Sequence, residues 1–297
     1  MTPPVDFAPR RTLRQTVEVG GVGLHTGASV KTTLVPATRP GTGVVFRITG
    51  GASGAVKEVA ARASNVSDTA RCTLLGSGAG TVSTVEHLLS ALAGFGVTDL
   101  IVEVDGPELP IGDGSALIWT EVLTSAGIVT MEEENGVAPL ALVEPVIEVG
   151  EKGAFVAAYP SDVPRFTVAT QFDHPLVGTQ VARWEPARGE AYAEHVAPAR
   201  TFGFDFEVEA LRAAGLARGG SLDNAVVIYP DRYSSSLRFP DELARHKLLD
   251  LVGDLFLVGR PLLADVVAVR PSHRLNVALA RRLVSTAAAT LRPNGRS

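Results

Sequence analysis

Strands followed by helices occur twice along this 297-residue chain, and this doubled pattern limits the fold more than any other feature of the sequence. In the first half, β-branched runs between turn residues predict strands at 15–19, 29–34, 43–48 and 100–104, and helical spacing predicts helices at 83–92 and 116–126. In the second half, the same reasoning predicts strands at 145–149, 155–158, 165–171 and 225–229, and helices at 207–216, 241–258 and 275–291. Strands and helices segregated in this way are typical of an α+β fold in which each sheet is packed with helices.

An acidic run at 132–136, followed closely by Pro139, is the best candidate for a linker between two domains. The chain is about twice as long as a typical domain of roughly 150 residues, which also favours two. We therefore expect an N-terminal α+β domain at residues 1–133 and a C-terminal α+β domain at 138–297. Two such layers facing one another would leave a cleft between them.

Charge and composition exclude several classes of function. The chain has 27 Lys and Arg against 32 Asp and Glu, so its net charge of −5 argues against nucleic-acid binding through bulk positive charge. No apolar run approaches the roughly 18 residues of a transmembrane helix, and the first 16 residues lack the apolar core of a secretory signal. Cys72, the single cysteine, forms neither an internal disulfide nor a thiolate zinc site by itself. We expect a cytoplasmic protein without a transmembrane segment.

The predicted helix at 241–258 carries the first candidate site. His246 and Asp250 are i, i+4 neighbours, and this spacing lets an imidazole and a carboxylate bind one metal ion from the same face. They lie with Lys247 and Asp254 in a narrow polar strip beside a wide apolar arc, so the strip is not expected to be fully solvated. An ordinary i, i+4 ion pair is the alternative interpretation.

Glu86 and His87 lie in the first turn of the predicted helix at 83–92. Ser83 and Glu86 fit a capping box, in which the carboxylate would only satisfy the start of the helix. A hydrolytic zinc site needs three N or O ligands, an open position and a nearby carboxylate to take a proton from water. Glu86 and His87, with His246 and Asp250, provide these groups, although spacing alone does not bring the two helices together.

The remaining candidates are weaker. Two glycine-rich loops, at 21–27 and 76–80, lack the G-K-[ST] and G-x-G-x-x-G patterns of nucleotide-binding loops. His25, His174 and His195 have no ligand spacing, and we interpret them as structural. Cys72 is expected to be a small buried hydrophobic residue.

Taken together, six segments resemble the UDP-3-O-acyl-N-acetylglucosamine deacetylases of lipid A biosynthesis. They keep the family's order between about Arg14 and Leu283, so the resemblance covers nearly the whole chain. The segments read GVGLHTG at 21–27, STVEHL at 83–88, DGPELPI with DGS at 105–115, ARTFGF at 199–204, GGSLDN at 219–224 and RHKLLD at 245–250.

The resemblance implies a two-domain α+β fold with one Zn²⁺ per chain in the cleft, held by His87, His246 and Asp250. Fe²⁺ is an alternative, because imidazole and carboxylate ligands accept both metals. Glu86 would be the general base that deprotonates the attacking water, while zinc polarises the acetamide carbonyl.

Further roles follow from the same resemblance. Thr201 matches a residue that hydrogen-bonds the oxyanion, and His273 matches a histidine that acts as a cation or proton donor. Asp254 lies beside His273 in this scheme and would orient an imidazole.

The substrate implied by the resemblance is a small UDP-linked acylated amino sugar. Lys247, Phe172 and Lys152 would contact its UDP part, and an apolar passage that includes Phe202, Ala225 and Val227 would hold the acyl chain. Three departures from the family pattern, Gln171, Ser272 and Arg274, affect the expected contacts with the substrate.

The expected reaction is zinc-dependent hydrolysis of the N-acetyl group of UDP-3-O-((R)-3-hydroxyacyl)-N-acetylglucosamine, which releases acetate in the committed step of lipid A biosynthesis. A catalytically silent binding homologue and an amidase for a different acylated sugar are the alternatives. The chain is expected to act as a monomer.

Overall fold

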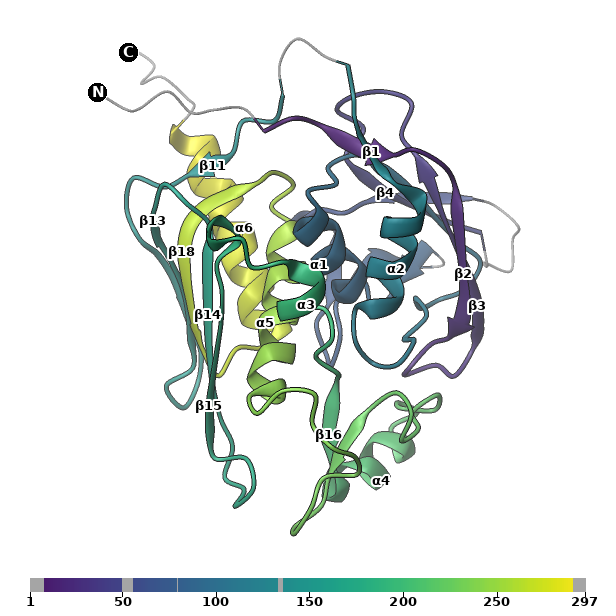
Figure 1. Ribbon diagram of the computed structural model, residues 1–297, viewed down its shortest axis with the longest axis vertical. Coiled ribbons are helices and arrows are strands. Elements are labelled where there is room, and N and C mark those ends of the chain that lie inside the picture. Colours follow the sequence, from purple (N-terminus) through teal and green to yellow (C-terminus); the bar gives the residue numbers. More distant parts are fainter. Residues whose placement is uncertain (1–7, 50–55, 79, 133–135, 291–297) are drawn as a thin grey trace.

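Helices lie between two β-sheets in this protein (Figure 1). The computed structural model describes residues 8–49, 56–78, 80–132 and 136–290. In Figure 1 one sheet lies on the left and the other on the right, with α1, α5 and α2 between them. The predicted α+β fold class, with sheets packed against helices, is confirmed.

The N-terminal half forms a five-stranded sheet in the order β2-β3-β9-β4-β5. Its strands are β2 (Val17–Val22), β3 (Ser29–Pro36), β4 (Val44–Ile48), β5 (Lys57–Ala60) and β9 (Leu100–Val104), and only the β4–β9 pair is parallel. In β3, Val30, Thr32 and Leu34 are buried while the residues between them point outward, as expected for a strand with one covered face. Helices α1 (Glu86–Phe95) and α2 (Leu117–Ala126) belong to this half.

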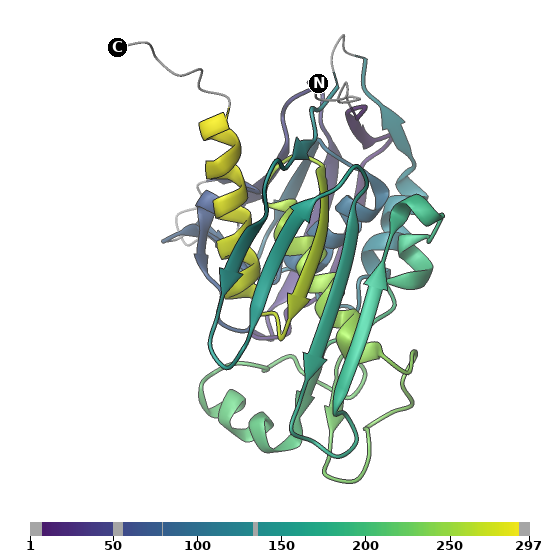
Figure 2. The same ribbon diagram turned by 90° about the vertical axis from the view of Figure 1, so that its left-hand side faces the viewer.

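The C-terminal half forms a six-stranded sheet around β18 (Leu262–Val269), seen face-on in Figure 2 with α5 behind it. β18 pairs with β13 (Phe155–Pro160), β14 (Arg165–Gln171) and, at its start, β11 (Leu140–Ala141); β12 (Val146–Val149) and β15 (Thr179–Trp184) complete the sheet. Helices α5 (Glu242–Phe256) and α6 (His273–Thr290) pack against it.

The contact between α1 and α5 joins the two halves. Gly253 of α5 lies so close to α1 that a Cβ atom there would be 2.1 Å from the carbonyl oxygen of Glu86. One continuous hydrophobic cluster includes Leu34 and Leu88 from the first half and Leu248 and Val266 from the second. Hydrophobic residues of both halves therefore pack around α1 and α5, and the two helices lie in close contact.

Smaller elements complete the chain. Strands β16 (Phe202–Phe204) and β17 (Val226–Ile228) pair in parallel, and α4 (Asp205–Ala213) follows β16 at the lower end of Figure 1. The others are β1 (Arg11–Leu13), β6 (Val66–Asp68), β7 (Leu74–Ser77), β8 (Gly80–Val82), β10 (Ile128–Thr130), α3 (Tyr192–His195) and the 3₁₀ turns η1 (Ala63–Asn65) and η2 (Pro186–Arg188). Among the described helices, none combines the length and apolar character needed to cross a membrane.

Most predicted elements are present, with ends shifted by a few residues. The helix predicted at 83–92 begins at Glu86, and the loop predicted at 76–80 contains the ends of β7 and β8. Three residues of the expected linker, 133–135, lie outside the described residues, as does residue 291 at the end of the last predicted helix. Several strands were not predicted, among them β5 in the N-terminal sheet and β15 and β18 in the C-terminal sheet.

Candidate metal centre

Glu86 and His87 form the first turn of α1, which has no side-chain cap. Ser83 does not cap the helix, because its hydroxyl lies 3.3 Å from the carbonyl oxygen of Pro107, to which it donates. The Glu86 carboxylate instead accepts a hydrogen bond of 3.0 Å from the backbone N–H of Thr73. The capping-box interpretation of Glu86 is therefore wrong, and its carboxylate is directed into the protein interior.

His87 of α1 meets His246 and Asp250 of α5 at the contact between the two helices. The Nε2 atoms of His87 and His246 lie 4.0 and 3.5 Å from Asp250 Oδ1, and one ligand atom from each residue falls within 4.8 Å of the other two. All three side chains are buried. The structure thus brings together residues that lie about 160 positions apart in the sequence.

Backbone carbonyls fix both imidazoles. His87 Nδ1 lies 3.3 Å from the Ser115 carbonyl oxygen, and His246 Nδ1 lies 3.1 Å from that of Ala199. When Nδ1 carries the proton and donates to a carbonyl, the lone pair is on Nε2, the atom that faces Asp250. This is the orientation that metal-binding histidines adopt.

The charge states of the three groups also suit a cation. Burial lowers the pKa of His87, and it lowers the pKa of His246 to about 4, so both imidazoles are neutral at pH 7. Burial alone would raise the pKa of Asp250, but Lys247 and the surrounding histidines hold it well below its usual range. Two neutral imidazoles and one carboxylate match the ligand set of a catalytic Zn²⁺ site, which keeps a position open for water.

Glu86, His273 and Asp254 lie next to this triad. His273 Nδ1 is 2.9 Å from Asp254 Oδ2, and His273 Nε2 is 3.9 Å from Asp250 Oδ2. Burial raises the pKa of the Glu86 carboxyl to about 7, with Asp254 and Asp250 acting in the same direction. Burial would lower the pKa of His273, but Asp254 and the other nearby carboxylates raise it to about 9. A group ready to accept a proton thus lies near one that carries a proton at neutral pH.

Sequence reasoning missed Thr73, which contacts all three of these groups. Its backbone N–H bonds to Glu86, its hydroxyl donates to Asp254 Oδ1 at 2.5 Å, and the same hydroxyl lies 3.4 Å from His273 Nδ1. Asn276 also donates to Asp254, over 2.9 Å. Thr73 lies in no periodic pattern, so only the fold reveals it.

Glu108 was also missed, although it lies in one of the quoted motifs. Its carboxylate accepts hydrogen bonds from the backbone N–H groups of His25 and Thr26 and from the hydroxyls of Thr26 and Thr84. A Cβ atom at position 23 would lie 2.3 Å from this carboxylate, so glycine is the residue that fits at this position. The 21–27 loop is therefore anchored to the segment that precedes α1.

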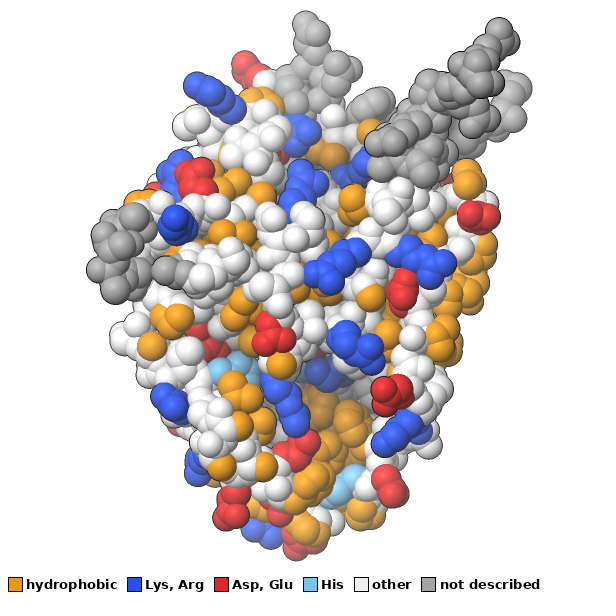
Figure 3. Space-filling view, turned by 180° about the vertical axis from the view of Figure 1, so that it is seen from behind, with side chains coloured by type: hydrophobic (Ala, Val, Ile, Leu, Met, Phe, Trp, Pro, Cys, Tyr) orange, Lys and Arg blue, Asp and Glu red, His pale blue; other side chains and the backbone are white. Residues whose placement is uncertain are grey.

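A cavity of about 600 Å³ opens beside His273. Six of the predicted site residues line it: Thr201, Phe202, Ala225, Val227, Lys247 and His273. Lys247 Nζ lies 2.8 Å from Asp250 Oδ2 and 5.6 Å from the centre of the Phe202 ring, so it connects the cavity to the triad. Figure 3 shows that the lower half of the molecule is hollowed, with hydrophobic side chains inside and basic side chains near its edge.

Two predicted substrate contacts lie outside this cavity lining. The Phe172 ring packs 5.6 Å from the ring of Phe202, just behind the wall. Lys152 lies in the turn between β12 and β13, where its carbonyl accepts a hydrogen bond from Arg270. Arg270 also donates to Gln171, one of the departures from the family pattern.

The other two departures lie at the start of α6. Ser272 lines the cavity, and its hydroxyl accepts a hydrogen bond from the backbone N–H of Leu275. Arg274 is exposed. Of the three histidines interpreted as structural, His25 lines the cavity, whereas His174 and His195 lie outside it. The buried Nδ1 of His25 has no hydrogen-bond partner among the residues that the structure describes.

Comparison with known proteins gives a consistent result. Residues 10–285 match the model of the family described as UDP-3-O-acyl N-acetylglycosamine deacetylase. The chain is 42% identical to a UDP-3-O-acyl-N-acetylglucosamine deacetylase from Chromobacterium violaceum, over 93% of this chain and 90% of the relative. Relatives with the same name from a Nostoc species and an Anaeromyxobacter species are 41% and 44% identical, over 93% of this chain and 98% and 88% of their own lengths.

Proposed function

The chain belongs to the UDP-3-O-acyl-N-acetylglucosamine deacetylase family, and from this premise we propose that it hydrolyses the N-acetyl group of UDP-3-O-((R)-3-hydroxyacyl)-N-acetylglucosamine. The products are acetate and the free amine, in the committed step of lipid A biosynthesis. The observation that carries the proposal is the convergence of His87, His246 and Asp250, with Glu86 beside them, on the face between α1 and α5.

His87, His246 and Asp250 would hold one Zn²⁺ per chain, and the same donors accept Fe²⁺. Such an ion, when bound, supplies a Lewis acid for the acetamide carbonyl and for the attacking water. Each imidazole donates a hydrogen bond from Nδ1 to a backbone carbonyl oxygen, and these two bonds keep the imidazoles oriented for this task.

Glu86 takes a proton from the water that attacks the carbonyl carbon, and its pKa of about 7 suits a base near neutral pH. Thr201, in the cavity wall, donates a hydrogen bond to the oxyanion. His273, held cationic by Asp254, stabilises the developing negative charge and protonates the amine when the C–N bond breaks. Thr73 is a positioning residue that keeps Glu86 and Asp254 in place.

The 600 Å³ cavity suits the acyl chain, with Phe202, Ala225 and Val227 in its wall. Lys247 provides a cation for the diphosphate, while Phe172 and Lys152 are further proposed contacts for the UDP part. We propose that the two domains divide between residues 133 and 138. We also propose a cytoplasmic monomer, and the single cysteine of the chain fits a reducing compartment.

The test is acetate release by the purified protein from the UDP-linked substrate. The expected result is activity that a chelator removes, that added Zn²⁺ restores, and that Glu86→Ala abolishes while metal content is unchanged. Activity that survives both the chelator and Glu86→Ala would overturn the proposal. Substrate binding without turnover would indicate a silent homologue, and preferential turnover of another acylated sugar would indicate a different amidase.

A further inference from the structure

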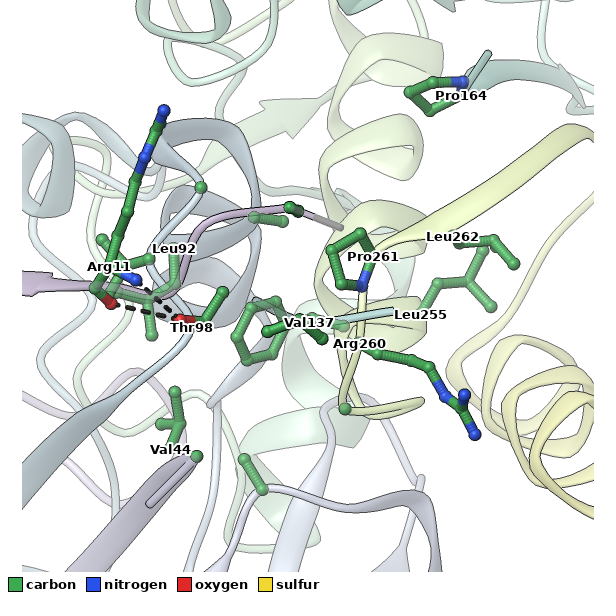
Figure 4. Close-up of a pocket in the computed structure, with 18 of the residues that line it drawn as sticks. Arg11, Val44, Leu92, Thr98, Val137, Pro164, Leu255, Arg260, Pro261 and Leu262 are labelled. Carbon is green, nitrogen blue, oxygen red and sulfur yellow. Dashed lines mark hydrogen bonds between the residues drawn. The ribbon is translucent and has the colours of Figure 1, made fainter. Parts of the chain in front are cut away.

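A second cavity, of about 350 Å³, lies at the other end of the α1–α5 pair (Figure 4). Leu92 and Ala93 from the last turns of α1, and Val252 and Leu255 from the last turns of α5, form part of its wall. Figure 4 shows Leu92, Leu255 and Leu262 around it, contributed by different parts of the chain. No described residue lines both this cavity and the 600 Å³ cavity, so it is a separate site.

Among the described residues that line this second cavity, the charged ones are all arginines: Arg10, Arg11, Arg62 and Arg260. Arg10 pairs with Asp99 at 3.3 Å, whereas within the described residues no carboxylate pairs with Arg11, Arg62 or Arg260. Guanidinium groups that lack a carboxylate partner and lie beside an apolar space attract an anionic group.

Arg62 and Arg260 share one edge of the cavity. The Arg62 guanidinium lies 3.4 Å from the carbonyl oxygen of Gly259 and 3.5 Å from that of Val258, so it is beside the residue that precedes Arg260. In Figure 4 the side chains of Arg11 and Arg260 extend away on opposite sides, which leaves the centre of the cavity apolar. The site therefore combines an apolar interior with a cationic edge.

We propose that this cavity binds a single-chain amphipathic anion, with the apolar chain beside the last turns of α1 and α5 and the acid group at Arg62 and Arg260. A volume of about 350 Å³ is at the small end of ligand sites, which suits one chain of medium length better than a two-chain lipid. Carboxylate and phosphate head groups share the required charge, and both are ligands that arginine binds through paired hydrogen bonds.

Trp184 provides a local reporter, because it lines this cavity while Trp119, the other tryptophan, lines neither cavity. The probe is dodecanoate with bromine on the last carbon, which quenches tryptophan fluorescence on contact. We expect saturable quenching in the full-length protein, loss of that quenching in Trp184→Phe, and affinity at least about tenfold weaker in Arg62→Gln/Arg260→Gln. Brominated dodecanol is the neutral control, and brominated dodecyl phosphate compares the two head groups.

Val227→Phe narrows the catalytic cavity and controls for binding there. Quenching that is unchanged in Val227→Phe supports the proposal. The proposal is overturned if quenching is absent, if the alcohol binds as tightly as the acid, if the double arginine variant binds normally, or if Val227→Phe removes the signal. Arg62 lies between β5 and η1, and Arg260 lies between α5 and β18; neither lines the catalytic cavity. Acetate release by the arginine variants therefore verifies that they are folded.

Discussion

Replacement of Asp254 by Asn tests the proposed electrostatic coupling of His273 most directly. Asp254 is completely buried and accepts hydrogen bonds from Thr73 and Asn276 in addition to its contact with His273. Its negative charge is the largest of the influences that raise the pKa of His273 to about 9. The Asn side chain has nearly the same shape but removes that charge.

The size of the effect follows from the change in the pKa of His273. Removing a neighbouring charge at this distance should lower that pKa by about 1 to 3, that is, to between roughly 6 and 8. With a pKa of about 7, the protonated fraction of His273 at pH 8 falls from about nine-tenths to about one-tenth. If the protonated form is the active one, kcat/KM at pH 8 falls about tenfold from this cause alone, and the alkaline limb of the pH profile moves toward neutral pH.

The assay is kcat/KM for acetate release between pH 5.5 and 10. For the unsubstituted protein we expect a bell-shaped profile, because activity rises as Glu86 loses its proton near pH 7 and falls as His273 loses its proton near pH 9. A bound divalent cation would move both limbs toward acid, so the comparison is between variants loaded with the same metal. Asn276→Ala removes a hydrogen bond to Asp254 but keeps its charge, and it should leave the alkaline limb in place. An alkaline limb in Asp254→Asn at the same pH as in the unsubstituted protein, with normal thermal stability and metal content, would refute the reasoning.

Three further predictions concern single residues near the site. Glu86→Gln should reduce kcat about 10²- to 10⁴-fold and remove the acid limb, whereas an acid limb that persists would assign it to another group. Gly253→Ala should lower the free energy of unfolding by about 1–3 kcal/mol in urea titrations, because its Cβ would meet the Glu86 carbonyl. Gly20→Ala, where a Cβ meets nothing within 4 Å, is the control, and equal stability of the two variants would count against close packing at Gly253. Burial raises the pKa of the Cys72 thiol to about 12. The native protein should therefore resist thiol-disulfide reagents at pH 8, and the denatured protein should react with one equivalent of reagent. Rapid labelling of the native protein would show that this thiol is accessible.

The periodic spacing of apolar residues predicted helices and strands correctly where one face of the segment is buried and the other is exposed. β3 alternates buried and exposed residues, and the helix predicted at 241–258 corresponds closely to α5, because each burial pattern has a simple period. β18 was missed although it is the central strand of its sheet. Its sequence, LLADVVAV, is largely apolar on both faces, so alternation between apolar and polar residues is weak, and its partners β11, β13 and β14 lie about 90 or more residues away.

Some site residues could likewise be identified from local sequence spacing, whereas others are identified only by contacts between distant segments. The i, i+4 spacing of His246 and Asp250 identified a candidate ligand pair within one helix, but nothing in their spacing pointed to His87. The capping-box pattern at Ser83 and Glu86 was misleading, because Ser83 donates to Pro107 and the helix begins later. Thr73 was not predictable, since its importance comes from neighbours contributed by α1, α5 and α6.

The close approach of α1 and α5 explains how this fold tolerates several buried charges at one place. Gly253 lets the two backbones approach until His87 faces Asp250, and the surrounding hydrophobic cluster excludes water from both helices. Exclusion of water raises the cost of each isolated charge, so Asp250 and Asp254 are compensated by Lys247, His273 and hydrogen bonds rather than by solvent. The same low polarity strengthens the interaction of any cation with Asp250. Packing between the helices and chemistry at the site therefore depend on the same contact, and a substitution that separates α1 from α5 should weaken metal binding and stability together.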